Sequence, residues 1–76
     1  MLEQSPRPHH SLSIPDVARR LGKSPRMVRD IIARGELRVC YEGKRQYIER
    51  GELEIYLHKR GHSAARIAQV VWDMPV

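Results

Sequence analysis

The sequence predicts a mainly α-helical fold with one small β-hairpin and a short C-terminal helix. Apolar residues recur at helical spacing in four short stretches, and between the second and third of these the apolar period falls to two. The chain has 76 residues, 41% of them hydrophobic, so we expect one folded domain and not a disordered chain. Its core is expected to be thin, because a domain of this size buries only about 60% of its unfolded surface.

The first helix is expected to begin after Ser13. This serine occupies the N-cap position, Asp16 follows three residues later, and Pro15 falls in the first turn, where its missing N–H costs nothing. Apolar residues then continue at helical spacing to Leu21, and Gly22 ends the helix. Residues 1–11 contain two prolines, two adjacent histidines and few apolar residues, so we expect a flexible tail there.

The second helix follows almost at once. Ser24 is its predicted N-cap, Pro25 occupies the first helical position, and Gly35 ends it in the left-handed conformation. The apolar stripe of this helix consists of Met27, Val28, Ile31 and Ile32. Two short helices joined by a tight glycine-containing turn, the second with a basic outer face, are typical of a helix-turn-helix.

A hairpin is expected next. Leu37, Val39 and Tyr41 alternate with polar or small residues, which predicts a half-buried strand, and residues 42–44 form the turn to a returning strand at 45–48. A basic hairpin after a helix-turn-helix is the layout of a wing, so the predicted fold is a winged helix-turn-helix. A third helix is expected to open at residues 49–52 and to end at Gly61, and Ser63 caps a last helix from 64 to about 71. The predicted division is a tail (1–11), the winged domain (12–61) and a C-terminal helix and tail (62–76).

The positive charge is concentrated in one segment. The chain carries +5, from 14 basic and 9 acidic residues. Nine of the basic residues and only three of the acidic ones lie between positions 19 and 45, so this segment carries +6 and the remainder −1. Such a concentration is expected of a surface that binds a polyanion.

Double-stranded DNA is the predicted partner. In helix-turn-helix proteins the N-terminal turn of the second helix enters the major groove, where arginines such as Arg26 and Arg29 can pair with guanine or bind phosphate. Cations at a wing tip can reach the adjacent minor groove. The predicted recognition-helix residues are Ser24, Pro25, Arg26, Arg29, Asp30 and Arg34, the predicted wing residues are Arg38, Lys44 and Arg45, and Arg19, Arg20 and Lys23 are expected to contact phosphates.

Metal ions, cofactors and catalysis are not expected. Cys40, His58 and His62 give only part of a zinc pattern, because the second cysteine is missing. The sequence has no glycine-rich phosphate loop and no nucleophile motif, so no enzyme is predicted. The single cysteine fits a reducing cytosol, and the lack of an apolar run of about 18 residues argues against a membrane partner. We therefore expect a cytoplasmic protein.

The C-terminal helix has two interpretations that the sequence leaves open. Its apolar residues are Ile67, Val70, Val71 and Trp72. They either fold back to enlarge the small core, as small domains often need, or form a contact with another protein.

Residues 12–57 resemble the excisionase-type branch of the mercury-resistance-regulator (MerR-like) winged-helix superfamily. The resemblance is carried by residues 12–24, 28–32 and 34–37, by Gly43-Lys44-Arg45 and by residues 52–57, in unbroken order. It implies a recognition helix around residues 24–34 and a wing around 38–47. Residues 62–76 lie outside the pattern of the superfamily.

The resemblance also implies a function. Small members of this branch are often excisionases, or recombination directionality factors, of phages and mobile elements. They bind repeats in an attachment site, bend the DNA and direct a tyrosine integrase toward prophage excision, without catalysis of their own. For this chain that implies attachment-site DNA, an integrase, self-association on DNA and a bacterial host. Two other hypotheses remain: a small MerR-like transcriptional regulator, and a protein-interaction adaptor with a basic face.

Overall fold

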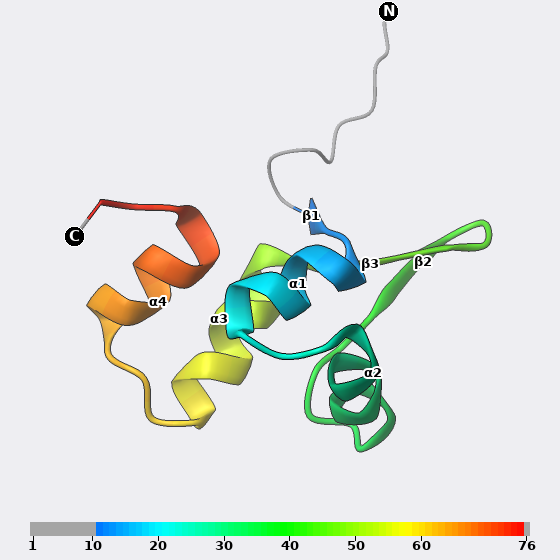
Figure 1. Ribbon diagram of the computed structural model, residues 1–76, viewed down its shortest axis with the longest axis horizontal. Coiled ribbons are helices and arrows are strands. Elements are labelled where there is room, and N and C mark those ends of the chain that lie inside the picture. Colours follow the sequence, from blue (N-terminus) through cyan, green and yellow to red (C-terminus); the bar gives the residue numbers. More distant parts are fainter. Residues whose placement is uncertain (1–10, 76) are drawn as a thin grey trace, which may run out of the picture.

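The computed structural model describes residues 11–75 and has four helices and a three-stranded antiparallel sheet (Figure 1). In chain order the elements are β1 (Ser11–Leu12), α1 (Ile14–Leu21), α2 (Pro25–Ala33), β2 (Cys40–Glu42), β3 (Arg45–Glu49), α3 (Arg50–Lys59) and α4 (Ala64–Trp72). This is a winged helix-turn-helix fold with an added C-terminal helix, as the sequence predicts. Of the predicted tail, residues 1–10 lie outside the described residues, whereas Ser11 belongs to β1.

Serine side chains cap three of the four helices. In α1, α2 and α4 the serine hydroxyl accepts a hydrogen bond from the backbone N–H three residues later, at 3.1 Å in each case. The capping residues are Ser13, Ser24 and Ser63, which confirms all three predicted caps. Gly22 ends α1 with φ 70°, and the next N–H, of Lys23, donates to the Ala18 carbonyl at 2.9 Å. This positive φ makes the tight turn that sets α2 against α1.

The sheet connects the wing to the helical body. Its strand order is β1-β3-β2, and the β2–β3 hairpin closes through Gly43 and Lys44, with Glu42 paired to Arg45. In β1, Leu12 pairs with Ile48, and both side chains are buried. The hairpin tip extends away from the body while its base is held by this third strand (Figure 1).

The core lies between α1, α2, α3, the base of the sheet and the inner face of α4. Its buried residues are Leu12, Ile14, Val17, Ala18, Val28, Ile31, Leu37, Ile48, Leu53, Tyr56, Leu57, Val70 and Val71. Val71 is fully buried, so α4 contributes directly to the core. In Figure 1, α4 lies at the opposite end of the molecule from the hairpin tip, which leaves α2 and the hairpin uncovered by it.

The structure corrects four details of the sequence prediction. The first strand of the hairpin begins at Cys40 and not at Leu37, which is buried in the segment after α2. Tyr41 is 64% exposed, because β2 lies on the part of the hairpin that projects beyond the core. Met27 is 48% exposed, because it lines a pocket at the surface between α2 and α3 and does not pack in the core. Trp72 belongs to α4, which is one residue longer than predicted.

Candidate nucleic-acid interface

The outer face of α2 carries two exposed arginines. Val28 and Ile31 are buried and fix one side of the helix against the core. At 3.6 residues per turn, Arg26 and Arg29 then project away from the core, and both are exposed. Within residues 11–75, neither arginine forms an ion pair with a carboxylate. Their guanidinium groups are therefore open to a ligand outside the protein.

The first turn of α2 is preorganised by its cap. The Ser24 hydroxyl accepts from the Met27 N–H, and Pro25 fixes the backbone at the first helical position. The remaining first-turn amides and the helix dipole favour an anion at this end. Both Ser24 and Pro25 are exposed, so the cap lies at the surface beside Arg26.

The C-terminal half of α2 is less strongly positive. Arg34 is exposed, but its Nε lies 3.3 Å from Oε2 of Glu36, which partly neutralises it. Asp30 is also exposed and adds a negative charge one turn before Arg34. The positive potential of α2 is therefore greatest toward its N-terminus, around Arg26 and Arg29.

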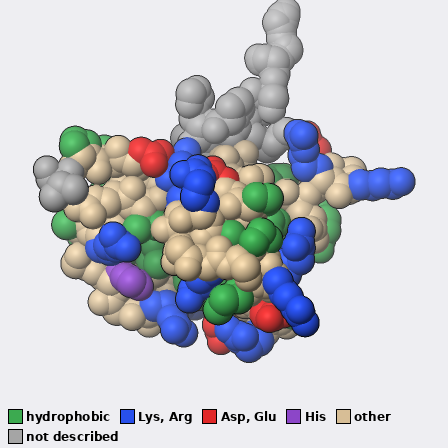
Figure 2. Space-filling view, in the orientation of Figure 1, with side chains coloured by type: hydrophobic (Ala, Val, Ile, Leu, Met, Phe, Trp, Pro, Cys, Tyr) green, Lys and Arg blue, Asp and Glu red, His purple; other side chains and the backbone are tan. Residues whose placement is uncertain are grey.

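The wing adds a second group of cations. Lys44 and Arg45 lie at the turn of the hairpin and Arg38 lies just before β2, and all three are exposed. In the part of the chain that the structure describes, none of the three has a carboxylate partner. Figure 2 shows lysine and arginine side chains over α2 and along the hairpin, on the same side of the molecule. The exposed cations thus lie on one side of the molecule, in separate groups over the two elements.

Comparison with known families agrees with this geometry. A family model described as a helix-turn-helix domain matches residues 11–61, about two thirds of the chain. The chain belongs to this helix-turn-helix family. No curated protein and no solved structure is similar enough to the chain to count as a match. The molecule is thus a small DNA-binding helix-turn-helix protein, and α2 is the second helix of its motif.

The three cations expected to contact phosphates differ in how exposed they are in this helix-turn-helix protein. Lys23 is exposed and has no ion pair with any described carboxylate. The Arg19 side chain is 72% exposed and hydrogen-bonds to the Asp16 carboxylate. The Arg20 side chain is only 10% exposed. Lys23 and Arg19 therefore remain accessible to DNA, and Arg20 does not.

The expectation for Arg20 is corrected, because the fold uses this arginine to hold α4. Its Nη1 donates to the Val70 carbonyl and to the Asp73 carboxylate, both at 2.8 Å. The hydrogen bond with Asp73 raises the pKa of Arg20 and lowers that of the carboxyl, with burial opposing both shifts. The guanidinium is thus occupied within the protein.

Arg50 also holds α4 in place, and it was not predicted as a site residue. It donates to the Val71 carbonyl, lies 3.8 Å from Asp73 and lies over the Trp72 ring at 5.4 Å. No local pattern in the sequence signals this role, because all three partners are more than 20 positions away. Two arginines, one from each of α1 and α3, thus hold the C-terminal turn of α4.

The two interpretations of the C-terminal helix apply to different residues. Val70 and Val71 are buried in the core, so neither is accessible to a partner, and the expectation of a protein contact is corrected for these two. Ile67 is half-buried and Trp72 is 38% exposed. Together with Ile55 of α3 they line a mainly apolar groove of about 390 Å³ between α3 and α4.

Across residues 11–75, no three or more His, Cys, Asp or Glu residues are grouped as a metal ion would require. Cys40 is a partly buried free thiol on β2. None of the helices in this range has the length and apolar character needed to cross a bilayer.

Proposed function

We propose that the protein is an excisionase: it binds several sites in attachment-site DNA, bends that DNA and directs an integrase toward excision. DNA binding follows from the family. The resemblance of residues 12–57 to the excisionase-type branch supports the finer assignment, because it includes the wing tip and the helix that follows as well as the helix-turn-helix. The proposed partners are double-stranded DNA, an integrase and further copies of this chain.

One observation carries the proposal. Six cations of α2, the turn before it and the wing are exposed and have no carboxylate partner among residues 11–75. They are Lys23, Arg26, Arg29, Arg38, Lys44 and Arg45. Cations that no internal carboxylate neutralises repel one another, and a phosphate backbone relieves this repulsion while releasing counterions.

The geometry suggests how the duplex is held. The N-terminal turn of α2 lies in the major groove, where Arg26 and Arg29 reach guanine O6 and N7 or the flanking phosphates. The hairpin tip reaches the neighbouring minor groove, where Lys44 and Arg45 contact the phosphates that line it. Binding both grooves from one rigid body favours a bent duplex, because the additional contacts offset a bending cost of about 1–6 kcal/mol.

Several protomers are needed for an extended bend. The longest axis of the molecule is 40 Å, close to one helical turn of DNA, about 34–36 Å. One protomer therefore covers about one turn, and adjacent protomers on repeated sites lie side by side. We place the contact between these copies at the groove of Ile55, Ile67 and Trp72, whose apolar side chains are partly exposed.

The first experiment uses a duplex that the protein itself selects from a randomised pool. Circular-permutation gel shifts on this sequence are expected to show successive complexes with increasing bend. The same complexes are then formed with Ile55→Lys, which is expected to lose cooperativity while its affinity for a single site is unchanged. A single unbent complex would contradict the excisionase proposal and favour the transcriptional regulator.

The second experiment tests the direction of recombination. The protein is added to a tyrosine integrase and its attachment-site substrates, and integrative and excisive products are measured separately. The proposal predicts that excision rises and integration falls with protein concentration. If the protein binds the DNA but changes neither product, the excisionase proposal is contradicted and the regulator hypothesis is favoured.

A further inference from the structure

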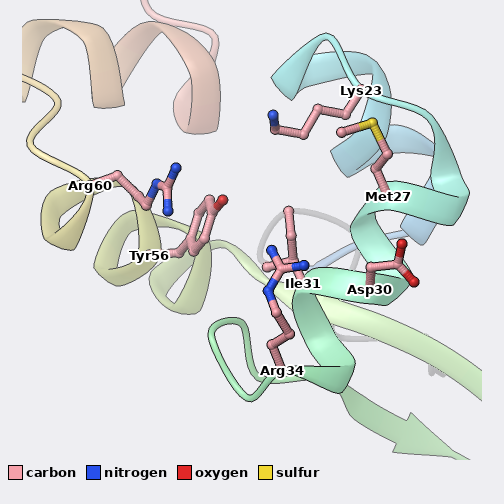
Figure 3. A pocket seen from close by; sticks show the side chains of 7 residues that line it. All are labelled: Lys23, Met27, Asp30, Ile31, Arg34, Tyr56 and Arg60. Carbon is pink, nitrogen blue, oxygen red and sulfur yellow. The ribbon is translucent and has the colours of Figure 1, made fainter.

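A cavity between α2 and α3 is lined by three cations from separate parts of the fold. Lys23 comes from the turn before α2, Arg34 from the residue that ends α2, and Arg60 from the end of α3. Figure 3 shows their charged groups directed into one space, with the Tyr56 hydroxyl between them. The cavity volume is about 100 Å³. Since a single water needs only about 10–15 Å³, there is room for a phosphate group.

The charges around the cavity are not balanced from inside the protein. Within residues 11–75, Lys23 and Arg60 have no carboxylate partner. Arg34 has one, Glu36, at 3.3 Å. Asp30 also lines the cavity, but Figure 3 shows its carboxylate directed to the other side of α2, away from Arg60. An oxyanion in this space would meet at least two cations that no carboxylate of the described residues neutralises.

Tyr56 adds a hydrogen-bond donor to the cations of the cavity. Tyr56 is only 5% exposed and belongs to the core, which limits where its hydroxyl can lie. Arg60 lies over the same ring, with Cζ 5.8 Å from the centroid, which limits where its guanidinium can lie. An O–H donor beside preorganised cations suits a phosphate oxygen.

The cavity also lies where a second DNA strand would pass. It is on the flank of α2 that faces α3, whereas the hairpin extends from the body on the other side of α2 (Figure 1). A helix in the major groove lies between two phosphate backbones, one on each flank. The hairpin cations are placed for one of these backbones, and the cavity is placed for the other.

We propose that the cavity of Lys23, Arg34, Tyr56 and Arg60 binds one phosphate group of the DNA backbone, on the strand opposite to that bound by the wing. The inference rests on the proposed DNA binding and adds a second, independent point of contact to it. With a phosphate held on each flank, α2 is fixed across the groove. Arg60 and Tyr56 lie outside the segment of concentrated positive charge, so the sequence alone does not indicate them.

The test compares two cavity variants with a matched control on the selected duplex. Each phosphate contact contributes about −0.9 to the slope of log K against log salt concentration, so Arg60→Gln is expected to make the slope less negative by about one. Tyr56→Phe keeps the buried ring and the charge, so it is expected to weaken binding by about threefold to tenfold with an unchanged slope. Arg66→Gln makes the same charge change as Arg60→Gln on α4, at an exposed position outside the cavity, and is expected to leave the slope as in the wild type.

The outcomes separate this inference from the proposed function. If the affinity of the wild type for the duplex did not depend on salt concentration, the proposed DNA binding itself would be contradicted. If the wild type binds the duplex with the expected salt dependence but Arg60→Gln and Arg66→Gln have equal slopes, phosphate binding by the cavity is contradicted and DNA binding is not. Thermal unfolding of Tyr56→Phe and Arg60→Gln is measured alongside, and wild-type midpoints are expected.

A second arm uses inorganic phosphate on the full chain and follows backbone amide shifts. Phosphate is expected to shift the amides of Lys23 and Arg60 in the free protein, and to have no such effect once the duplex is bound, because the backbone phosphate then occupies the cavity. Equal shifts with and without DNA would mean that the cavity binds free phosphate only, and would overturn the assignment to the DNA backbone.

Discussion

Arg20 binds Asp73 through two hydrogen bonds, Nη1 to Oδ1 at 2.8 Å and Nη2 to Oδ2 at 3.1 Å, although 53 positions separate them in the chain. Asp73 is the C-cap of α4 and has φ 58°, a left-handed conformation that aspartate tolerates better than most side chains. The same guanidinium donates to the Val70 carbonyl in the last turn of α4. This relationship positions the C-terminal helix, and it removes one arginine from the surface predicted to bind DNA.

Replacing Arg20 is expected to destabilise the fold. Arg20→Ala removes a charged donor from the Val70 carbonyl, and hydrogen bonds of this kind contribute about 1.5–3 kcal/mol. The free energy of unfolding, measured in urea, should fall by roughly that amount. Arg19→Ala is the control: its side chain is 72% exposed and, among residues 11–75, pairs with Asp16 alone, so a change below about 0.5 kcal/mol is expected. Equal effects of the two variants would show that Arg20 does not hold α4.

The Arg20–Asp73 pair is also expected to make stability depend on pH in acid. The hydrogen bond from Arg20 holds the pKa of Asp73 below its ordinary value of 3.8. The unfolded chain therefore binds this proton first, so the contribution of the pair is complete above pH 3.8 and is lost as pH falls from there through the folded-state pKa. Asp73→Asn is expected to be less stable than the wild type at neutral pH, with the difference shrinking over that acid range. A difference that stays constant with pH would contradict this assignment.

Arg29 is expected to carry sequence-specific binding. Arg29→Ala should weaken binding to the selected duplex by about 1–3 kcal/mol, the discrimination expected of one bidentate guanine contact. Binding to a scrambled duplex should change much less. Arg66→Ala provides the control for the loss of one exposed arginine. Unchanged affinity of Arg29→Ala for the selected duplex would show that the recognition surface lies elsewhere.

The wing is expected to act without sequence preference. Lys44→Ala combined with Arg45→Ala should weaken binding to selected and scrambled duplexes by the same factor, because both residues are expected to contact phosphate. The slope of log K against log salt should become less negative by about two. A changed ratio of selected to scrambled affinity would mean that the wing reads bases.

Much of the fold was predictable because its signals are local. Ser13 and Ser24 with their following prolines mark the helix starts, and Gly22 fixes the turn between α1 and α2 through its positive φ. Each of these signals acts within a few residues. By contrast, β1 has only two residues, too few to show a period, and forms only because Leu12 pairs with Ile48.

The candidate site was predictable where exposure follows from helix geometry and not where it depends on distant partners. Arg26 and Arg29 are exposed because Val28 and Ile31 define the buried side of α2. Arg20 belongs to the same basic segment, but Asp73 and the end of α4 enclose it. That contact joins residues 53 positions apart in the chain, and no spacing in the sequence indicates it.

The central claim is that the exposed cations of α2 and the wing bind duplex DNA, and the salt dependence of that binding tests it most directly. If about four of the six cations meet phosphates, log K should fall against log salt with a slope of about −4. The measurement needs only the wild-type chain and the selected duplex across a range of salt concentrations. A slope of about −4 is the predicted result, and an affinity that does not change with salt would contradict the account.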